Sequence, residues 1–261
     1  MSPFPGPGTA TLAVDGNTTS RVFHIGSGKT VSISGLTVTH GIVASGSGGG
    51  ILNDHAILTI LNSTVSGNYA YSVGGGIYND ASNGGNATLT IVNSTVDGNS
   101  AAHDDIPFGG GEGGGIYNDS GTLMITSSVV SNNYAGLPGP NFPVGIGGGI
   151  SNYGTLTITE STITSNQVYL FGGGIQNSGT LTITSSTISG NEASGQHDGQ
   201  PWGHGGGISG TVTLTNSTVS GNGASLSGGG IEGSVSSRTA RLAATVTAGF
   251  PPAEWRLEIR F

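Results

Sequence analysis

The stretch GGGISNYGTLTITESTITSN, residues 147–166, contains the pattern that decides the fold. Its opening tetrapeptide, Gly-Gly-Gly-Ile, occurs seven times, and successive copies lie 23 to 39 residues apart by subtraction of their positions. A spacing with a fixed minimum and occasional extra length indicates a solenoid whose coils carry loop insertions. Each coil of a solenoid buries its apolar residues only against its neighbours, so no single central cleft is expected. The tetrapeptides end at Ile51, Ile77, Ile116, Ile150, Ile175, Ile208 and Ile231.

Apolar and polar residues alternate within each copy, as in the segment TLTIT at 155–159, and this alternation predicts short strands. Alignment of the copies adds three apolar columns to the isoleucine column. Stacked at about 4.8 Å, the spacing of neighbouring strands, the four columns make one continuous core. The sequence therefore predicts an all-β fold, a right-handed parallel β-helix solenoid of about seven coils with three short strands per coil. The added columns are Val31, Leu58, Leu89, Leu123, Leu156, Leu181, Val212; Ile33, Ile60, Ile91, Ile125, Ile158, Ile183, Leu214; and Val38, Val65, Val96, Val130, Ile163, Ile188, Val219.

A column of asparagines marks a turn in each coil. Asparagine tolerates left-handed backbone, and its amide can hydrogen-bond the coil above or below. We therefore expect these residues to tie the coils together. They are Asn68, Asn99, Asn133, Asn166, Asn191 and Asn222.

The repeated pair of Gly-Gly-Gly-Ile and a segment such as Val65-Ser66-Gly67-Asn68 resembles the polymorphic outer-membrane-protein repeats of bacteria. Those repeats pair Gly-Gly-Ala-aliphatic with Phe-x-x-Asn in β-helices of the pectin-lyase-like fold. Here Gly replaces the usual Ala, and Val or Ile replaces the usual Phe, over roughly residues 11–232. The resemblance implies a secreted protein, or one at the bacterial cell surface or outer membrane.

The composition excludes several classes of function. Lys and Arg total six, and none lies between Lys29 and Arg238. Phosphate backbones and anionic lipids need such cations, so we expect no nucleic-acid partner and no anionic membrane partner. No apolar run reaches the roughly 18 residues of a membrane-spanning helix, so this segment is not expected to insert into a membrane. Cys is absent, and the first residues do not resemble a signal peptide, so an extracellular location rests on the resemblance alone.

Three regions follow from the pattern. Residues 1–30 resemble an incomplete N-terminal coil, residues 31–233 form the repeat body, and residues 234–261 diverge from the motif. The divergent segment alternates polar and apolar residues near its end, which suits either a capping strand or a tail unrelated to the repeat. Because a solenoid needs caps and neither end supplies a clear one, we expect the chain to be part of a longer repeat array.

Three long insertions, at 100–112, 134–146 and 192–204, follow the turn asparagine of their coils. Equivalent corners of a solenoid stack, so we expect these loops to line one edge, with all insertions at the same corner. Aromatic, acidic and imidazole side chains together suit a sugar ring, although the aromatic residues could instead fold back to cover the coils. The candidate ligand-binding residues are His103, Asp104, Asp105, Phe108, Phe142, His197, Asp198, Trp202 and His204.

A second candidate site is the column Asp54, Asp80 and Asp119, which occupies one position on three successive coils. Stacked carboxylates repel unless they turn into water or share a cation, and Ca²⁺ accepts carboxylate oxygens with loose geometry. The competing interpretation is a solvated turn with local Asx hydrogen bonds. Calcium is the only cofactor that the sequence suggests.

A third feature is an array of threonines, such as Thr157, Thr182 and Thr213, on consecutive strands. Flat threonine ladders are used by ice-binding β-helices, but Thr is also a strong strand former that keeps an exposed face soluble. Ice binding is therefore the lesser alternative among the functions considered.

The main expectation is a non-catalytic, secreted or surface-displayed repeat region, an adhesin-like or passenger scaffold that presents loops to a glycan or protein partner. The alternative is a polysaccharide-active enzyme, a lyase or glycoside hydrolase of the pectin-lyase-like fold. The resemblance implies that a lyase of this fold uses a Lys or Arg near a metal-bound uronate. The repeat body contains neither Lys nor Arg. No catalytic residue is assigned, and whether the chain is an enzyme stays open.

Overall fold

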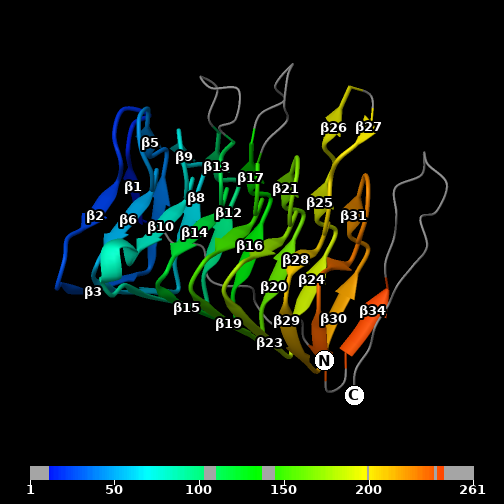
Figure 1. Ribbon diagram of the computed structural model, residues 1–261. Helices are drawn as coiled ribbons and strands as arrows, with labels where there is room; N and C mark the ends of the chain where they lie inside the picture. Colours follow the sequence, from blue (N-terminus) through cyan, green and yellow to red (C-terminus); the bar gives the residue numbers. More distant parts are fainter. Residues whose placement is uncertain (1–11, 103–109, 137–144, 199, 238–239, 244–261) are drawn as a thin grey trace.

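The computed structural model describes residues 12–102, 110–136, 145–198, 200–237 and 240–243. Within these ranges the chain is a right-handed parallel β-helix, with coils stacked side by side along one axis (Figure 1). The predicted fold class is therefore confirmed. The described residues contain no α-helix and one 3₁₀ turn, Ser82–Gly84. None of them belongs to a helix long and apolar enough to cross a membrane.

Two of the four parallel sheets begin each coil, and we name them sheets B and C. Sheet B consists of β2 (Phe23–Ile25), β6 (Ile51–Asp54), β10 (Ile77–Asp80), β14 (Ile116–Asp119), β18 (Ile150–Asn152), β22 (Ile175–Asn177), β28 (Ile208–Gly210) and β32 (Ile231–Glu232). Sheet C consists of β3 (Thr30–Ser34), β7 (Ile57–Leu61), β11 (Thr88–Val92), β15 (Thr122–Thr126), β19 (Thr155–Thr159), β23 (Thr180–Thr184), β29 (Val212–Thr215) and β33 (Val235–Ser237).

The other two sheets, A and D, complete each coil. Sheet A consists of β1 (Leu12–Asp15), β4 (Leu36–Thr39), β8 (Thr64–Ser66), β12 (Thr95–Asp97), β16 (Val129–Ser131), β20 (Thr162–Thr164), β24 (Thr187–Ser189), β30 (Ser217–Ser220) and β34 (Ala240–Ala243). Sheet D consists of β5 (Ile42–Val43), β9 (Tyr69–Ala70), β13 (Ser100–Ala101), β17 (Tyr134–Ala135), β21 (Gln167–Val168), β25 (Glu192–Ala193) and β31 (Gly223–Ala224). A separate antiparallel pair joins β26 (Gln196–His197) to β27 (Gln200–Pro201).

Sheet D adds a fourth strand to the three expected per coil, and its seven strands mark seven complete coils. Each of its strands has only two residues. A two-residue segment is too short to show an alternating pattern, which is why the sequence predicts three strands per coil and not four.

The four predicted apolar columns form the core. The isoleucines of sheet B from Ile51 to Ile208 are fully buried, and the columns of sheets C and A join them in one hydrophobic cluster. Fully burying each such side chain contributes about 1.5–3 kcal/mol relative to leaving it exposed. The core therefore runs the length of the solenoid, and every coil contributes side chains to it.

The turn asparagines form a buried ladder between the coils, as predicted. The Nδ2 group of Asn99 donates to Oδ1 of Asn133 at 3.0 Å, and that of Asn133 donates to Oδ1 of Asn166 at 2.9 Å. The residue in left-handed backbone is not the asparagine but the one before it, such as Gly98 with φ 62° or Asn132 with φ 54°. The expectation of left-handed asparagines was therefore wrong by one position.

A second asparagine ladder runs at the end of the sheet B strands. Nδ2 of Asn79 donates to Oδ1 of Asn118 at 2.7 Å, and Asn118 and Asn152 repeat this bond at the same distance. The ladder begins at Asn53 and ends at Asn177. Two ladders at two corners hold each coil in register with the next.

The triple glycines are needed where neighbouring coils approach most closely. Gly74 has φ 64°, a backbone conformation that side chains rarely adopt. A Cβ on Gly75 would collide with the backbone carbonyl groups of Ser100 and Gly114 on the next coil. The motif is therefore a packing requirement of the stack.

Strands extend beyond residues 31–233, the repeat body that the sequence predicts. Strand β1 pairs with β4, so residues of the expected incomplete coil already belong to sheet A. Strands β33 and β34 pair with β29 and β30 inside the divergent segment. The expected capping strand at 254–261 lies outside the described residues.

The first prediction tests the ladder. Asn133→Ala removes the acceptor of two buried donors on Asn99, its backbone N–H and its Nδ2 group. A buried donor left without a partner costs about 1–3 kcal/mol, so we expect a clear fall in melting temperature, read by circular dichroism. The control is Asn86→Ala at an exposed position, which should change stability by less than about 0.5 kcal/mol. Equal melting temperatures for the two variants would contradict a stabilising ladder.

Candidate functional site

The outer face of sheet B carries most of the chemically distinctive side chains of the described residues. Along each strand the side chains alternate, so that Ile51 and Asn53 are buried while Leu52 and Asp54 point outward. The strands pair in register, which places Asp54 opposite Asp80 and Asp80 opposite Asp119. The predicted column of three aspartates therefore exists in space.

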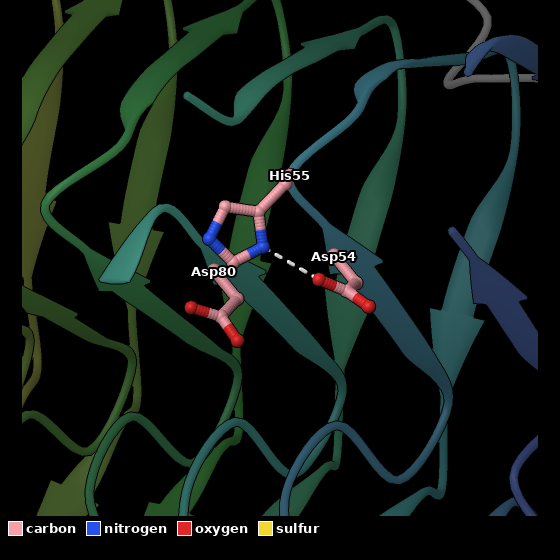
Figure 2. Close-up of side chains that lie close together, drawn as sticks. All are labelled: Asp54, His55 and Asp80. Carbon is pink, nitrogen blue, oxygen red and sulfur yellow. Dashed lines mark hydrogen bonds and ion pairs between the residues drawn. The ribbon is translucent and has the colours of Figure 1, made fainter. Parts of the chain in front are cut away.

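Two of these aspartates converge with a histidine. One donor atom each from Asp54, His55 and Asp80 lies within 4.8 Å of the other two, and Figure 2 shows the three side chains turned toward one another. His55 has left-handed backbone with φ 52°, and its N–H donates to the carbonyl of Asp80 at 2.9 Å. The coil stacking that aligns the aspartates therefore also positions the imidazole.

The imidazole of His55 bridges two acceptors. Its Nδ1 lies 2.6 Å from Oδ1 of Asp54, and its Nε2 lies 2.9 Å from the carbonyl oxygen of Ser82. The hydrogen bond to Asp54 is the main cause that raises the pKa of His55, and the bond to Ser82 adds to it. Hydrogen bonds from His55 and then from His24 lower the pKa of Asp54. The pair therefore favours an imidazolium beside a carboxylate.

Asp119 does not join this cluster. Its carboxylate accepts hydrogen bonds from Tyr78 Oη at 3.2 Å and from Ser120 Oγ at 3.0 Å. The sequence identifies the aspartate column, but in its third member, Asp119, hydroxyl groups already hydrogen-bond the carboxylate.

An open groove of about 380 Å³ lies beside the cluster, between the first strands of sheet C and the turn after Asp54. Its lining includes His55, Lys29 and Asn86. Lys29 is the last basic residue before the repeat body. The stacking of the coils therefore places the ammonium group of Lys29 near the cluster, although Lys29 and Asp80 are far apart in the sequence.

Three tyrosines form a row on the same face. Tyr78 and Tyr117 are paired in register, with ring centroids 5.4 Å apart, and Tyr153 follows with a centroid 5.5 Å from that of Tyr117. All three rings are partly buried, and burial is the main cause that raises the pKa of each phenol. We call these residues the tyrosine row. Sequence reasoning missed it, although Tyr78 and Tyr117 at equivalent positions of adjacent copies were a visible signal.

Glu112 lies at the edge of the tyrosine row. It forms isolated bridges with Val73 and Ile146 on the neighbouring coils, and its carboxylate accepts a hydrogen bond from Tyr153 Oη at 3.0 Å. Burial raises its pKa, against the lowering effect of the Tyr153 hydrogen bond. Glu112 is thus a carboxyl group that takes up a proton more readily than usual.

Much of the predicted loop site lies outside the described residues. His103, Asp104, Asp105 and Phe108 fall in 103–109, and Phe142 falls in 137–144. The three insertions begin with β13, β17 and β25 of sheet D, which matches the expected common corner.

The third insertion is described in part and contains the β26–β27 hairpin (Figure 1). His197 lies on β26, Asp198 is exposed at the turn, and Trp202 is partly buried. His204 stacks on Phe171 with centroids 5.1 Å apart, and its Nδ1 lies 2.8 Å from Ser227 Oγ. His204 also pairs with Glu232, so it is fixed within the coil stack and is not displayed on a loop.

One insertion falls at a corner that the sequence did not predict. Residues 81–87, with the 3₁₀ turn Ser82–Gly84, connect β10 to β11, whereas only residues 120 and 121 connect β14 to β15. The expectation that all insertions share one corner was therefore wrong. Both corners fall within the same long spacing between Ile77 and Ile116, so its length alone does not reveal two insertions.

The threonine array is in register on the outer face of sheet C. Thr157 pairs with Thr182 and Thr182 with Thr213. Ile57 and Met124 interrupt the face as exposed apolar residues. Ice binding stays a prediction.

Comparisons with family models, curated proteins and solved structures find no match to this chain.

The second prediction uses the raised pKa of Glu112. The folded chain holds this proton more tightly than the unfolded chain, so the stabilisation is present at low pH and is lost as pH rises through the raised pKa. Glu112→Gln removes the buried charge and should melt at a higher temperature than the parent at neutral pH. The difference should shrink as pH falls through the raised pKa and should level off below 4.5, the ordinary pKa of the group. The control is Glu160→Gln at an exposed site, and an equal gain there would contradict a specific effect of burial.

Proposed function

We propose that this chain is a non-catalytic β-helical binding scaffold that holds a glycan along the outer face of sheet B. The observation that carries the proposal is the tyrosine row. Its rings follow one another at 5.4 and 5.5 Å along the stacking direction of the coils. A chain of sugar rings can lie along such a row, with its apolar ring faces on the aromatic side chains.

Hydrogen-bonding groups border the row and suit sugar hydroxyls. Glu112 and Asp119 supply carboxylate oxygens next to Tyr153 and Tyr78. Acceptors at the rim of an aromatic surface fix the orientation of a ligand that stacks on it. The site therefore combines an apolar surface with a few oriented polar groups.

The charge of this face favours a neutral glycan. The chain has a formal net charge of −8, and the groups next to the tyrosine row are acidic. A uronate or sulfated chain would meet like charge along the row. A hydroxyl-rich, uncharged polysaccharide meets acceptors instead.

The predicted loops remain part of the proposal, because in the sequence they come shortly before the bridged residues Glu112 and Ile146. Residues 103–109 precede Glu112, and 137–144 precede Ile146, which is bridged to Glu112. Loops on a rigid scaffold are common positions for recognition. We propose that they contribute specificity at the edge of the row, for a glycan or for a glycosylated surface protein.

The resemblance to polymorphic outer-membrane-protein repeats supports a location outside the cell. A solenoid with an extended face suits an adhesin-like or passenger region there, since ligands of that environment include long polysaccharides. This location is part of the proposal.

A polysaccharide-active enzyme is the second candidate, and the presence of two carboxyl groups beside the tyrosine row, Glu112 and Asp119, favours it. Burial raises the pKa of Glu112. Glycoside hydrolysis uses two carboxyl groups whose environments differ. Asp104 and Asp198, which the sequence predicts as ligand-binding residues, are the loop carboxyl groups to test for this role.

The third prediction tests the tyrosine row on an array of neutral and acidic glycans. Tyr117→Ala should weaken binding of the best neutral glycan by about fivefold, because an aromatic contact contributes on the order of 1 kcal/mol. Affinity is then measured by calorimetry on that glycan.

The matched control is Tyr134→Ala. Tyr134 is also partly buried and packs on a tyrosine, Tyr169, with centroids 6.1 Å apart, but it lies on sheet D. It should leave glycan affinity unchanged. Preference for acidic glycans, or equal loss in both variants, would count against the proposed face.

The fourth prediction separates binding from catalysis. Incubation with neutral glycans, pectins and alginates should give neither new reducing ends nor unsaturated products. Turnover that is abolished by Glu112→Gln or Asp119→Asn would make the enzyme the preferred function. Turnover abolished only by Asp104→Ala or Asp198→Ala would place the catalytic site in the loops.

A further inference from the structure

The cluster of Asp54, His55 and Asp80 has a donor set that differs from the predicted aspartate column. It joins one imidazole to two carboxylates from neighbouring coils, within 4.8 Å (Figure 2). Donors that share a tetrahedral metal ion at about 2.0–2.2 Å lie about 3.4 Å apart, so the side chains would have to move closer to ligate one ion together. The stacking therefore brings the three donors together but does not by itself set the final ligand geometry.

The Ser82 carbonyl orients the imidazole of His55. A carbonyl oxygen can only accept, so Nε2 of His55 carries the proton of that 2.9 Å bond. In the neutral imidazole Nδ1 is then a bare acceptor, and it faces the Asp54 carboxylate at 2.6 Å. Nδ1, the nitrogen that faces the carboxylates, is therefore the one that would coordinate a metal ion.

Residues around the cluster hold its members in place. His24 Nε2 lies 3.2 Å from Oδ2 of Asp54, and the Ser82 N–H donates to Oδ1 of Asp80 at 2.9 Å. The backbone of Gly85 packs so closely on the His55 ring that a Cβ there would collide with it. A backbone carbonyl on the far nitrogen of a ligating histidine is a common supporting contact in metal sites.

We propose that Asp54, His55 and Asp80 form a binding site for a divalent metal of the zinc class. Imidazole nitrogen with two carboxylates suits Zn²⁺ and its first-row neighbours, whereas Ca²⁺ and Mg²⁺ prefer oxygen ligands alone. Three protein donors leave coordination positions for water or for a ligand, and the groove that His55 lines gives access to them. The proposal does not depend on glycan binding.

The test is calorimetric titration of the whole chain with Zn²⁺, followed by thermal melting with and without the metal. We expect one Zn²⁺ per chain, a higher melting temperature with Zn²⁺, and no comparable response to Ca²⁺. His55→Gln and Asp80→Asn should each weaken Zn²⁺ binding by at least about tenfold. Circular dichroism without metal verifies that each variant is folded. If His55→Gln does not fold, the Zn²⁺ affinity of Asp80→Asn decides the test.

The matched control is His40→Gln. His40 also pairs with an aspartate, Asp15, at 2.9 Å, but it belongs to no group of three donors among the described residues. It should bind Zn²⁺ as the parent does. Absence of stoichiometric Zn²⁺ binding, equal loss in the control, or a stronger response to Ca²⁺ would each overturn the proposal.

Discussion

Hydrogen bonds between buried asparagine amides set the register on which the rest of the molecule depends. Each ladder amide donates to the next coil, as Asn99 does to Asn133 at 3.0 Å and Asn79 does to Asn118 at 2.7 Å. A buried amide without such a partner costs free energy, so a shift of one residue between coils would leave both ladders unsatisfied. Parallel strands slip readily when nothing specifies their pairing, and the two ladders prevent this.

A fixed register turns a repeated sequence into columns of like residues, and columns of charge need compensation. The three stacked aspartates show three different solutions. Asp54 lies between two histidines, Asp80 accepts a backbone N–H of the inserted turn, and Asp119 accepts two hydroxyl groups. The same stacking brings aromatic rings into contact when Tyr occupies equivalent positions, which lowers the exposed apolar area of each ring.

The solenoid offers an extended face where a globular enzyme offers a cleft. On the outer face of sheet B the metal-type cluster and the tyrosine row are continuous, because Asp80 and Tyr78 belong to one strand, β10. A long ligand that follows the row would approach the cluster at the end nearer to the first coils. The proposed glycan and metal sites thus share one face, because outward positions repeat from coil to coil.

The sequence by itself determined the fold, because the apolar columns, the turn asparagines and the triple glycines each require stacked coils. It also identified the aspartate column and the common corner of the three long insertions, since both depend only on position within the repeat. The sequence did not reveal the two-residue strands of sheet D or the second insertion corner, because such short segments carry no periodic signal. Only the tertiary structure brought Ser82 to His55 and Glu112 to Tyr153, because these contacts join different coils, and only it shows that the His55 ring turns onto the neighbouring Asp54. Side-chain direction and the path of each turn decide such contacts, and the repeat pattern specifies neither.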